Sequence, residues 1–78
     1  MRIVSMQNYE VMYHKFFAKK IREIRKANKL SQEKFAEKLD CSREFISRLE
    51  NNKEKLSLKL LLKLAHVFNI NLREFFAK

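Results

Sequence analysis

The sequence predicts an all-α domain of five helices, two of them short and joined by a tight turn. Neither glycine nor proline occurs in its 78 residues, so turns must be made by Asn, Asp and Lys. Apolar residues recur with the helical period from about residue 13 onward. Residues 42–53 place their apolar and charged side chains on opposite sides of a helix.

The first predicted helix spans residues 13–28, with apolar residues on one face and lysines and arginines pointing away from it. Residues 1–12 have no clean period, and we treat them as an N-terminal arm or extension. The domain itself is expected to span residues 13–78.

Two short helices follow, over residues 32–39 and 43–51. Ser31 and Ser42 precede them, and serine is a good N-cap because its hydroxyl accepts a hydrogen bond from an unpaired backbone N–H. Two helices separated by about three residues form the helix-turn-helix arrangement. The side of the second helix that faces away from its apolar stripe carries Arg43, Glu44, Ser47, Arg48 and Asn51.

A fourth helix is predicted over residues 58–68 after Ser57, and a fifth over residues 72–76 after Asn71. The apolar arc of the fourth helix is about twice as wide as a surface helix needs, so part of it should face the deep core or a partner subunit. The predicted core consists of Phe17, Ile21, Ile24, Phe35, Leu39, Ile46, Leu49, Leu60, Leu64 and Phe68.

Composition narrows the function. A net charge of +9 attracts polyanions: nucleic acid, an anionic membrane surface or an acidic protein.

No apolar run reaches the roughly 18 residues of a membrane span, and the start lacks a signal peptide, so we expect a cytoplasmic protein. One cysteine, Cys41, and two histidines make a disulfide or a metal site unexpected. No nucleophile–base–orienter set is visible, so we expect neither an enzyme nor a cofactor or small-molecule substrate.

A dense set of residues between positions 21 and 76 follows one known pattern. Its members are Ser31, Gln32, Ala36, Leu39, Ser42, Ile46, Ser47, Leu49, Glu50, Leu60, Leu64 and Ala65. In these residues the chain resembles the Cro/repressor-type, or XRE-like, helix-turn-helix family. The resemblance implies a lambda-repressor-like five-helix bundle, sequence-specific binding of double-stranded DNA and usually a homodimer.

The chain departs from this family at its turns. The family favours glycine where this sequence has Lys29, Asp40 and Asn52, and proline where it has Leu56. A left-handed residue other than glycine costs roughly 1 kcal/mol, and less for Asn or Asp. An aliphatic residue at the position of Leu56 also occurs in controller proteins of restriction–modification systems, so the resemblance favours that branch.

A recognition helix enters the major groove with its first residues at the base edges. Arg43 and Arg48 can each donate two hydrogen bonds to guanine, or can instead be solvated or bound to phosphate. Glu44 can accept from cytosine, or orient a neighbouring arginine. With Ser47, these residues are the predicted base contacts.

The predicted phosphate contacts are Gln32, Ser42, Asn51 and Lys53. The resemblance implies phosphate contacts at the positions of Gln32 and Lys53. It also implies an ion pair between Arg25 and Glu50, for which the alternative is two independent surface charges.

We therefore expect a transcriptional regulator that binds a pseudo-palindromic operator as a homodimer and acts as a repressor or an activator. The predicted dimer interface consists of Val67, Leu72, Phe75 and Phe76. Two other functions are compatible with the sequence: an antitoxin that also represses its own operon, and a basic adaptor that binds protein or RNA without reading bases.

Overall fold

The computed structural model describes residues 6–75, and these are helical apart from the connections. The helices are α1 (Met6–Ala27), α2 (Gln32–Leu39), α3 (Arg43–Glu50), α4 (Leu58–Val67) and α5 (Leu72–Phe75). Four of them have at least eight residues, whereas α5 is a single turn of four. Residues 6–75 contain no β-strand, which confirms the all-α class. We describe the fold as four helices followed by one helical turn.

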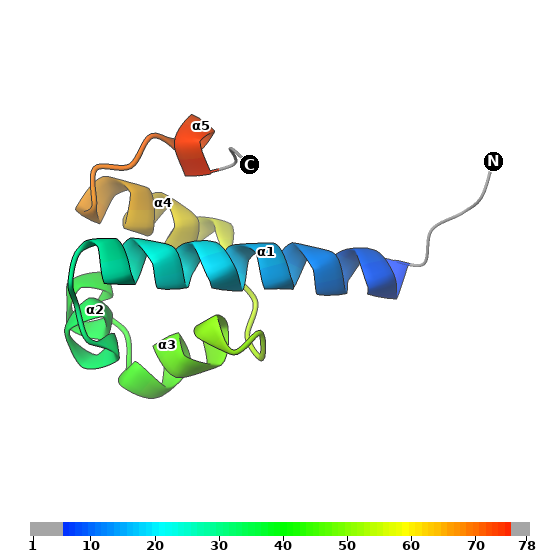
Figure 1. Ribbon diagram of the computed structural model, residues 1–78, viewed down its shortest axis with the longest axis horizontal. Helices are drawn as coiled ribbons and strands as arrows, with labels where there is room; N and C mark the ends of the chain where they lie inside the picture. The colour runs from blue at the N-terminus through cyan, green and yellow to red at the C-terminus, as the bar shows by residue number, and fades with distance from the viewer. Residues whose placement is uncertain (1–5, 76–78) are drawn as a thin grey trace.

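The helix α1 is the longest element, and its first turns project beyond the other helices (Figure 1). In this view α2 and α3 lie on one side of α1, and α4 and α5 lie on the other. The helix begins at Met6 rather than near residue 13. Residues 1–12 show no clean apolar period in the sequence, so periodicity did not reveal these first turns. Met12, in this part of α1, is 70 % exposed.

Serine caps begin the three middle helices, as predicted. The Oγ atoms of Ser31, Ser42 and Ser57 each accept a hydrogen bond at 3.1 Å from the backbone N–H three residues later. Each bond satisfies one of the N–H groups that a helix start leaves unpaired. The bounds of α2 match the prediction, and α3 and α4 each end one residue earlier than predicted.

Four connections begin with the same backbone turn, a Schellman motif. Its left-handed residue has φ of 53° to 64° and is, in chain order, Lys29, Asp40, Asn52 and Asn69. The following residue donates its N–H at 2.8–3.1 Å to the carbonyl five residues earlier; these donors are Leu30, Cys41, Lys53 and Ile70. The first three left-handed residues occupy the positions at which the resemblance expects glycine.

The donor residue of this motif usually makes an apolar contact with the helix it ends. Leu30, Cys41 and Ile70 follow that rule, because each is partly buried against the core. Burial also raises the pKa of the Cys41 thiol. Lys53 is the exception, since it is exposed at the end of α3.

Most of the predicted core is buried. Phe35 and Ile46 are 0 % exposed, and seven of the ten predicted residues are buried. Ile24, Leu60 and Phe68 are partly buried and pack against that core. The buried residues that the sequence did not reveal include Leu56, Leu61 and Phe75.

The position of Phe75 corrects one prediction. Its side chain is 3 % exposed, and its ring stacks on Phe17 at a centroid distance of 5.3 Å and an interplanar angle of 22°. It therefore belongs to the core of its own chain, and its assignment to the dimer interface is wrong. Two adjacent phenylalanines cannot both point inward, and the sequence alone does not say which one does. Phe76 lies outside the described residues.

We expect Lys29→Gly to stabilise the protein. Glycine avoids the steric clash of a left-handed lysine but adds freedom to the unfolded chain, so the expected gain in unfolding free energy is about 0.5 kcal/mol. Urea denaturation measures this change. The matched control is Lys26→Gly inside α1, which should lose about 1 kcal/mol. Equal losses in both variants would contradict the assigned strain.

Candidate nucleic-acid interface

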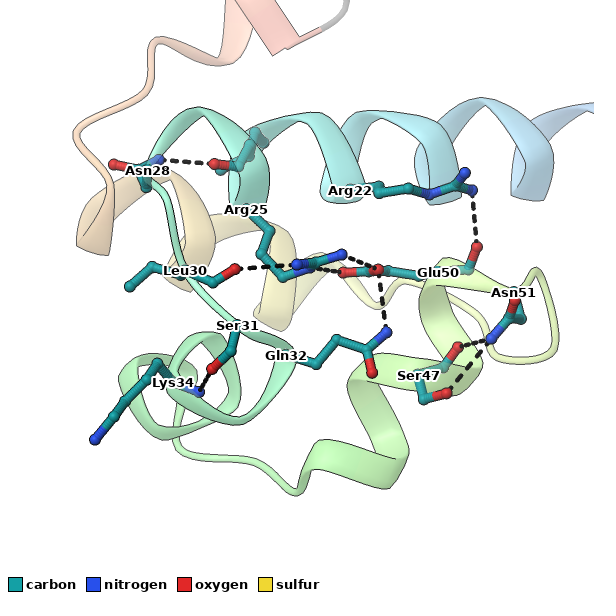
Figure 2. A network of polar contacts seen from close by, with 11 residues as sticks. Arg22, Arg25, Asn28, Leu30, Ser31, Gln32, Lys34, Ser47, Glu50 and Asn51 are labelled. Atoms are coloured by element: carbon teal, nitrogen blue, oxygen red, sulfur yellow. Dashed lines mark hydrogen bonds and ion pairs between the residues drawn. The ribbon is translucent and has the colours of Figure 1, made fainter.

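The carboxylate of Glu50 joins α1, α2 and α3 (Figure 2). Arg25 on α1 donates from Nε to Oε2 at 2.6 Å and from Nη2 to Oε1 at 3.0 Å. Gln32, at the start of α2, donates from Nε2 to Oε1 at 3.2 Å. Two arginine contacts to backbone carbonyls complete the network: Arg22 Nη2 to Glu50 and Arg25 Nη1 to Leu30, both at 3.0 Å. These bonds fix α3 against the first two helices.

The central ion pair is nearly shielded from solvent. The side chain of Glu50 is 4 % exposed and that of Arg25 is 15 % exposed. The hydrogen bond with Glu50 raises the pKa of Arg25, so its guanidinium stays charged. A carboxylate in such a place requires a partner, because an unpaired buried charge is strongly unfavourable. The two groups therefore form a bidentate pair and are not independent surface charges.

The helix α3 has one anchored side and one exposed side. Ile46 and Leu49 are 0 % and 2 % exposed and hold the helix in the core. Arg43 and Glu44, in the first turn, are exposed. Arg43 and Glu44, two of the predicted base contacts, are therefore open to solvent on a helix that the core holds in place.

Ser47 and Asn51 bond to each other on the last turn of α3 (Figure 2). Asn51 Nδ2 donates to the carbonyl of Ser47 at 2.8 Å and to its Oγ at 3.4 Å. Ser47 is half-buried. Ser42, at the other end of the helix, uses its Oγ as the capping acceptor. Both serine hydroxyls keep their own proton for donation to a ligand.

Arg48 is held by two neighbours. Its Nε donates to Glu54 Oε2 at 3.2 Å, and its guanidinium carbon lies 5.9 Å from the ring centroid of Phe45. Sequence reasoning did not single out Glu54. A carboxylate six residues after an arginine has no helical relation to it, and only the turn at the end of α3 brings the two together.

The predicted phosphate contacts differ in availability. Gln32 is half-buried and its amide is engaged with Glu50, so it contributes to the network before any ligand binds. Lys53 is exposed. Arg22 and Lys15, with Asn51 and Asn52, line a hollow of about 400 Å³ beside the end of α3. Arg22 and Lys15 therefore place positive charge on α1 beside the end of α3, although Glu50 also lines the hollow.

Two features are absent from the part of the chain that the structure describes, a metal-ligand cluster and a membrane-spanning helix. Within residues 6–75 no group of three His, Cys, Asp or Glu could hold a metal ion. The same range contains no helix that is both long and apolar enough to cross a membrane.

Comparison with known proteins gives the family. The helix-turn-helix family model matches residues 21–75. The chain belongs to this family, in its Cro/repressor-type or XRE-like form. It is accordingly a DNA-binding regulator of transcription, and α2 and α3 are its helix-turn-helix.

Two relatives carry informative names. The chain is 39 % identical over 62 residues to "Control protein C.MunI" from Mycoplasma sp, a match that covers 78 % of this chain and 84 % of the relative. It is 40 % identical over 57 residues to an "Uncharacterized HTH-type transcriptional regulator" from Archaeoglobus fulgidus, covering 73 % and 81 %. The first relative agrees with the resemblance to controller proteins. No solved structure matches the chain significantly.

We expect Arg25→Ala to lower the free energy of unfolding by about 3 kcal/mol, because it leaves the buried carboxylate of Glu50 without its charged partner. Urea denaturation measures the loss. Lys34→Ala is the matched control, since it removes an exposed pair with Glu37 at 3.5 Å. Its effect should stay below about 1 kcal/mol. Similar losses in both variants would show that the network does not hold the helices together.

Proposed function

We propose that this protein regulates transcription as a homodimer bound to a pseudo-palindromic operator. The observation that supports this most directly is the geometry of α3, whose buried side anchors it while Arg43, Glu44 and Arg48 are exposed. Two such helices, related by a two-fold axis, would enter successive major grooves about 34 Å apart. The one-turn α5 would complete the five-helix bundle expected of the family.

Base reading is assigned to the exposed side of α3. Arg43 and Arg48 would each donate to O6 and N7 of a guanine, and Glu44 would accept from cytosine N4. Each good bidentate contact is worth roughly 1–3 kcal/mol of discrimination. Ser47 would contribute through its hydroxyl proton.

Backbone positioning is assigned chiefly to Lys53. In the other three Schellman turns the equivalent residue, which follows the left-handed one, is partly buried: Leu30, Cys41 or Ile70. Among these four residues only Lys53 is charged and exposed. A cation held by a fixed turn beside a recognition helix suits a phosphate contact. Gln32 at the start of α2, and Ser42 and Asn51 at the two ends of α3, would add neutral donors.

The relative named as a control protein favours a controller type of regulator. We place this chain in that role, with occupancy of the operator set by the concentration of the dimer. An antitoxin or an adaptor function has no observation of its own in the structure.

The proposed dimer interface lies at the end of α4 and the start of α5. Val67 is 38 % exposed and Leu72 is half-buried. Beside Val67 is a hollow of about 400 Å³ with a mixed lining: Leu30 and Phe68 are apolar, whereas Asn28, Lys38 and Asn69 are polar. A two-fold interface uses the same patch on both copies, so the patch must be self-complementary, and here apolar contacts from Val67 and Leu72 would be bordered by polar side chains.

Selection of bound duplexes from a random pool tests the function. We expect a symmetric site with half-sites about one helical turn apart, bound at least about 10³-fold more tightly than random duplex. Arg43→Ala should relax the preference at one position of each half-site, whereas Lys53→Ala should weaken binding to all duplexes alike. Uniform, salt-sensitive binding by the native protein would overturn base reading.

Val67→Lys is expected to dissociate the dimer, because it places a charge in an apolar contact. Sedimentation equilibrium measures the dimer dissociation constant. Leu62→Lys is the matched control: this leucine is 48 % exposed and lies on the opposite edge of the apolar arc of α4. A monomer produced by the Leu62 variant alone would move the interface to that edge.

A further inference from the structure

Glu54 is an acidic residue beside a helix that must approach a polyanion. Its side chain is 35 % exposed, and it accepts a hydrogen bond from Arg48, one of the proposed base-reading residues. A carboxylate repels DNA phosphates, so its position beside this arginine calls for a physical reason. Another carboxylate, Glu44, lies one turn before Arg48 on α3, yet the ion pair of Arg48 in the described structure is with Glu54.

The contact uses a specific edge of the guanidinium. Nε of Arg48 donates to Glu54 at 3.2 Å, which leaves Nη1 and Nη2 as the remaining donor edge. That edge matches the O6 and N7 acceptors of guanine. The ring centroid of Phe45 lies 5.9 Å from the guanidinium carbon, and this cation–π contact further restricts the orientation of the Arg48 side chain.

The backbone holds this arrangement in place. The carbonyl of Arg48 accepts a hydrogen bond at 2.8 Å from the N–H of Lys53, the residue immediately before Glu54. The left-handed Asn52, with φ of 64°, makes this return possible. The carboxylate is thus delivered to the arginine by a turn that is anchored on the arginine's own peptide group, and not by a freely moving loop.

We infer that Glu54 is a positioning residue that sets the base preference of Arg48. By engaging Nε, it keeps the two Nη groups oriented as a fork for guanine. This inference rests on the proposed function, because it requires Arg48 to read a base. It assigns a specificity role to the α3–α4 connection, whereas Lys53 in the same turn serves affinity.

The test uses Glu54→Gln, which keeps the volume of the side chain and removes its charge. Binding is measured to a panel of duplexes with each operator position varied, for the native protein, Glu54→Gln, Arg48→Ala and the double variant. Glu37→Gln is the matched control, because it makes the same charge change and breaks an exposed ion pair on α2. The Nε–H resonance of Arg48 reports on the contact independently.

Arg48→Ala should abolish the guanine preference at one position of each half-site. Glu54→Gln should lower the preference at that same position by about threefold to fivefold, as expected for loss of one exposed charged contact. It should leave the other positions unchanged and bind random duplex at least as well as the native protein, since a negative charge is gone. In the Arg48→Ala background it should change no preference. Glu37→Gln should change none either, and solvent exchange at Arg48 Nε should quicken only in Glu54→Gln.

Two outcomes would overturn the inference in different ways. If Arg48→Ala relaxes one position and Glu54→Gln leaves it intact, Glu54 does not position the arginine, and the proposed function stands. If Arg48→Ala relaxes no position, the base contact assigned to Arg48 is wrong, and the role of Glu54 is lost with it.

Discussion

The fold depends on one requirement, that the buried carboxylate of Glu50 have a charged partner. Removing Arg25 would leave this carboxyl group, almost sealed from water, without its charged partner, which is strongly destabilising. The requirement reaches beyond the pair, since Gln32 binds the same carboxylate and Arg22 binds the carbonyl of the same residue. The position of α3 is therefore set by directional hydrogen bonds as well as by apolar packing. The base contacts proposed for α3 need such a fixed position, because hydrogen bonds to bases tolerate little displacement.

The second constraint is the way the chain turns without glycine. Within residues 6–75, each of the four left-handed residues carries a side chain, and three of them are Asn or Asp, for which this conformation is least costly. The resemblance marked three of the positions as unusual, and the backbone explains them as Schellman turns. The same motif closes three helices with a partly buried residue and one with an exposed lysine. The exception lies at the end of α3, the helix proposed to read bases.

Local signals were sufficient for much of this architecture. Serine caps and apolar spacing predicted the bounds of α2 and most of the core. Caps and apolar spacing depend on residues three or four positions apart, which the sequence shows directly. The Arg25–Glu50 pair was available only through the family resemblance, because the two residues are 25 positions apart. The contact between Arg48 and Glu54 was not visible at all, as it depends on a turn conformation and on rotamers. The choice of Phe75 as the inward aromatic ring depended on how a four-residue helix docks on α1.

The short connections between the helices also affect how the chain acquires its structure. Helices that stop and restart within a few residues make most of their contacts with near neighbours in sequence, and such topologies fold in microseconds to milliseconds. The stacking of Phe75 on Phe17 joins residues far apart in the sequence and closes a long loop. The conformational entropy lost on closing a loop rises with the length of the loop. This contact is therefore expected to form after the contacts between neighbouring helices. During synthesis the helix-turn-helix of α2 and α3 can thus form first, and the aromatic stack follows only after Phe75 has left the ribosome.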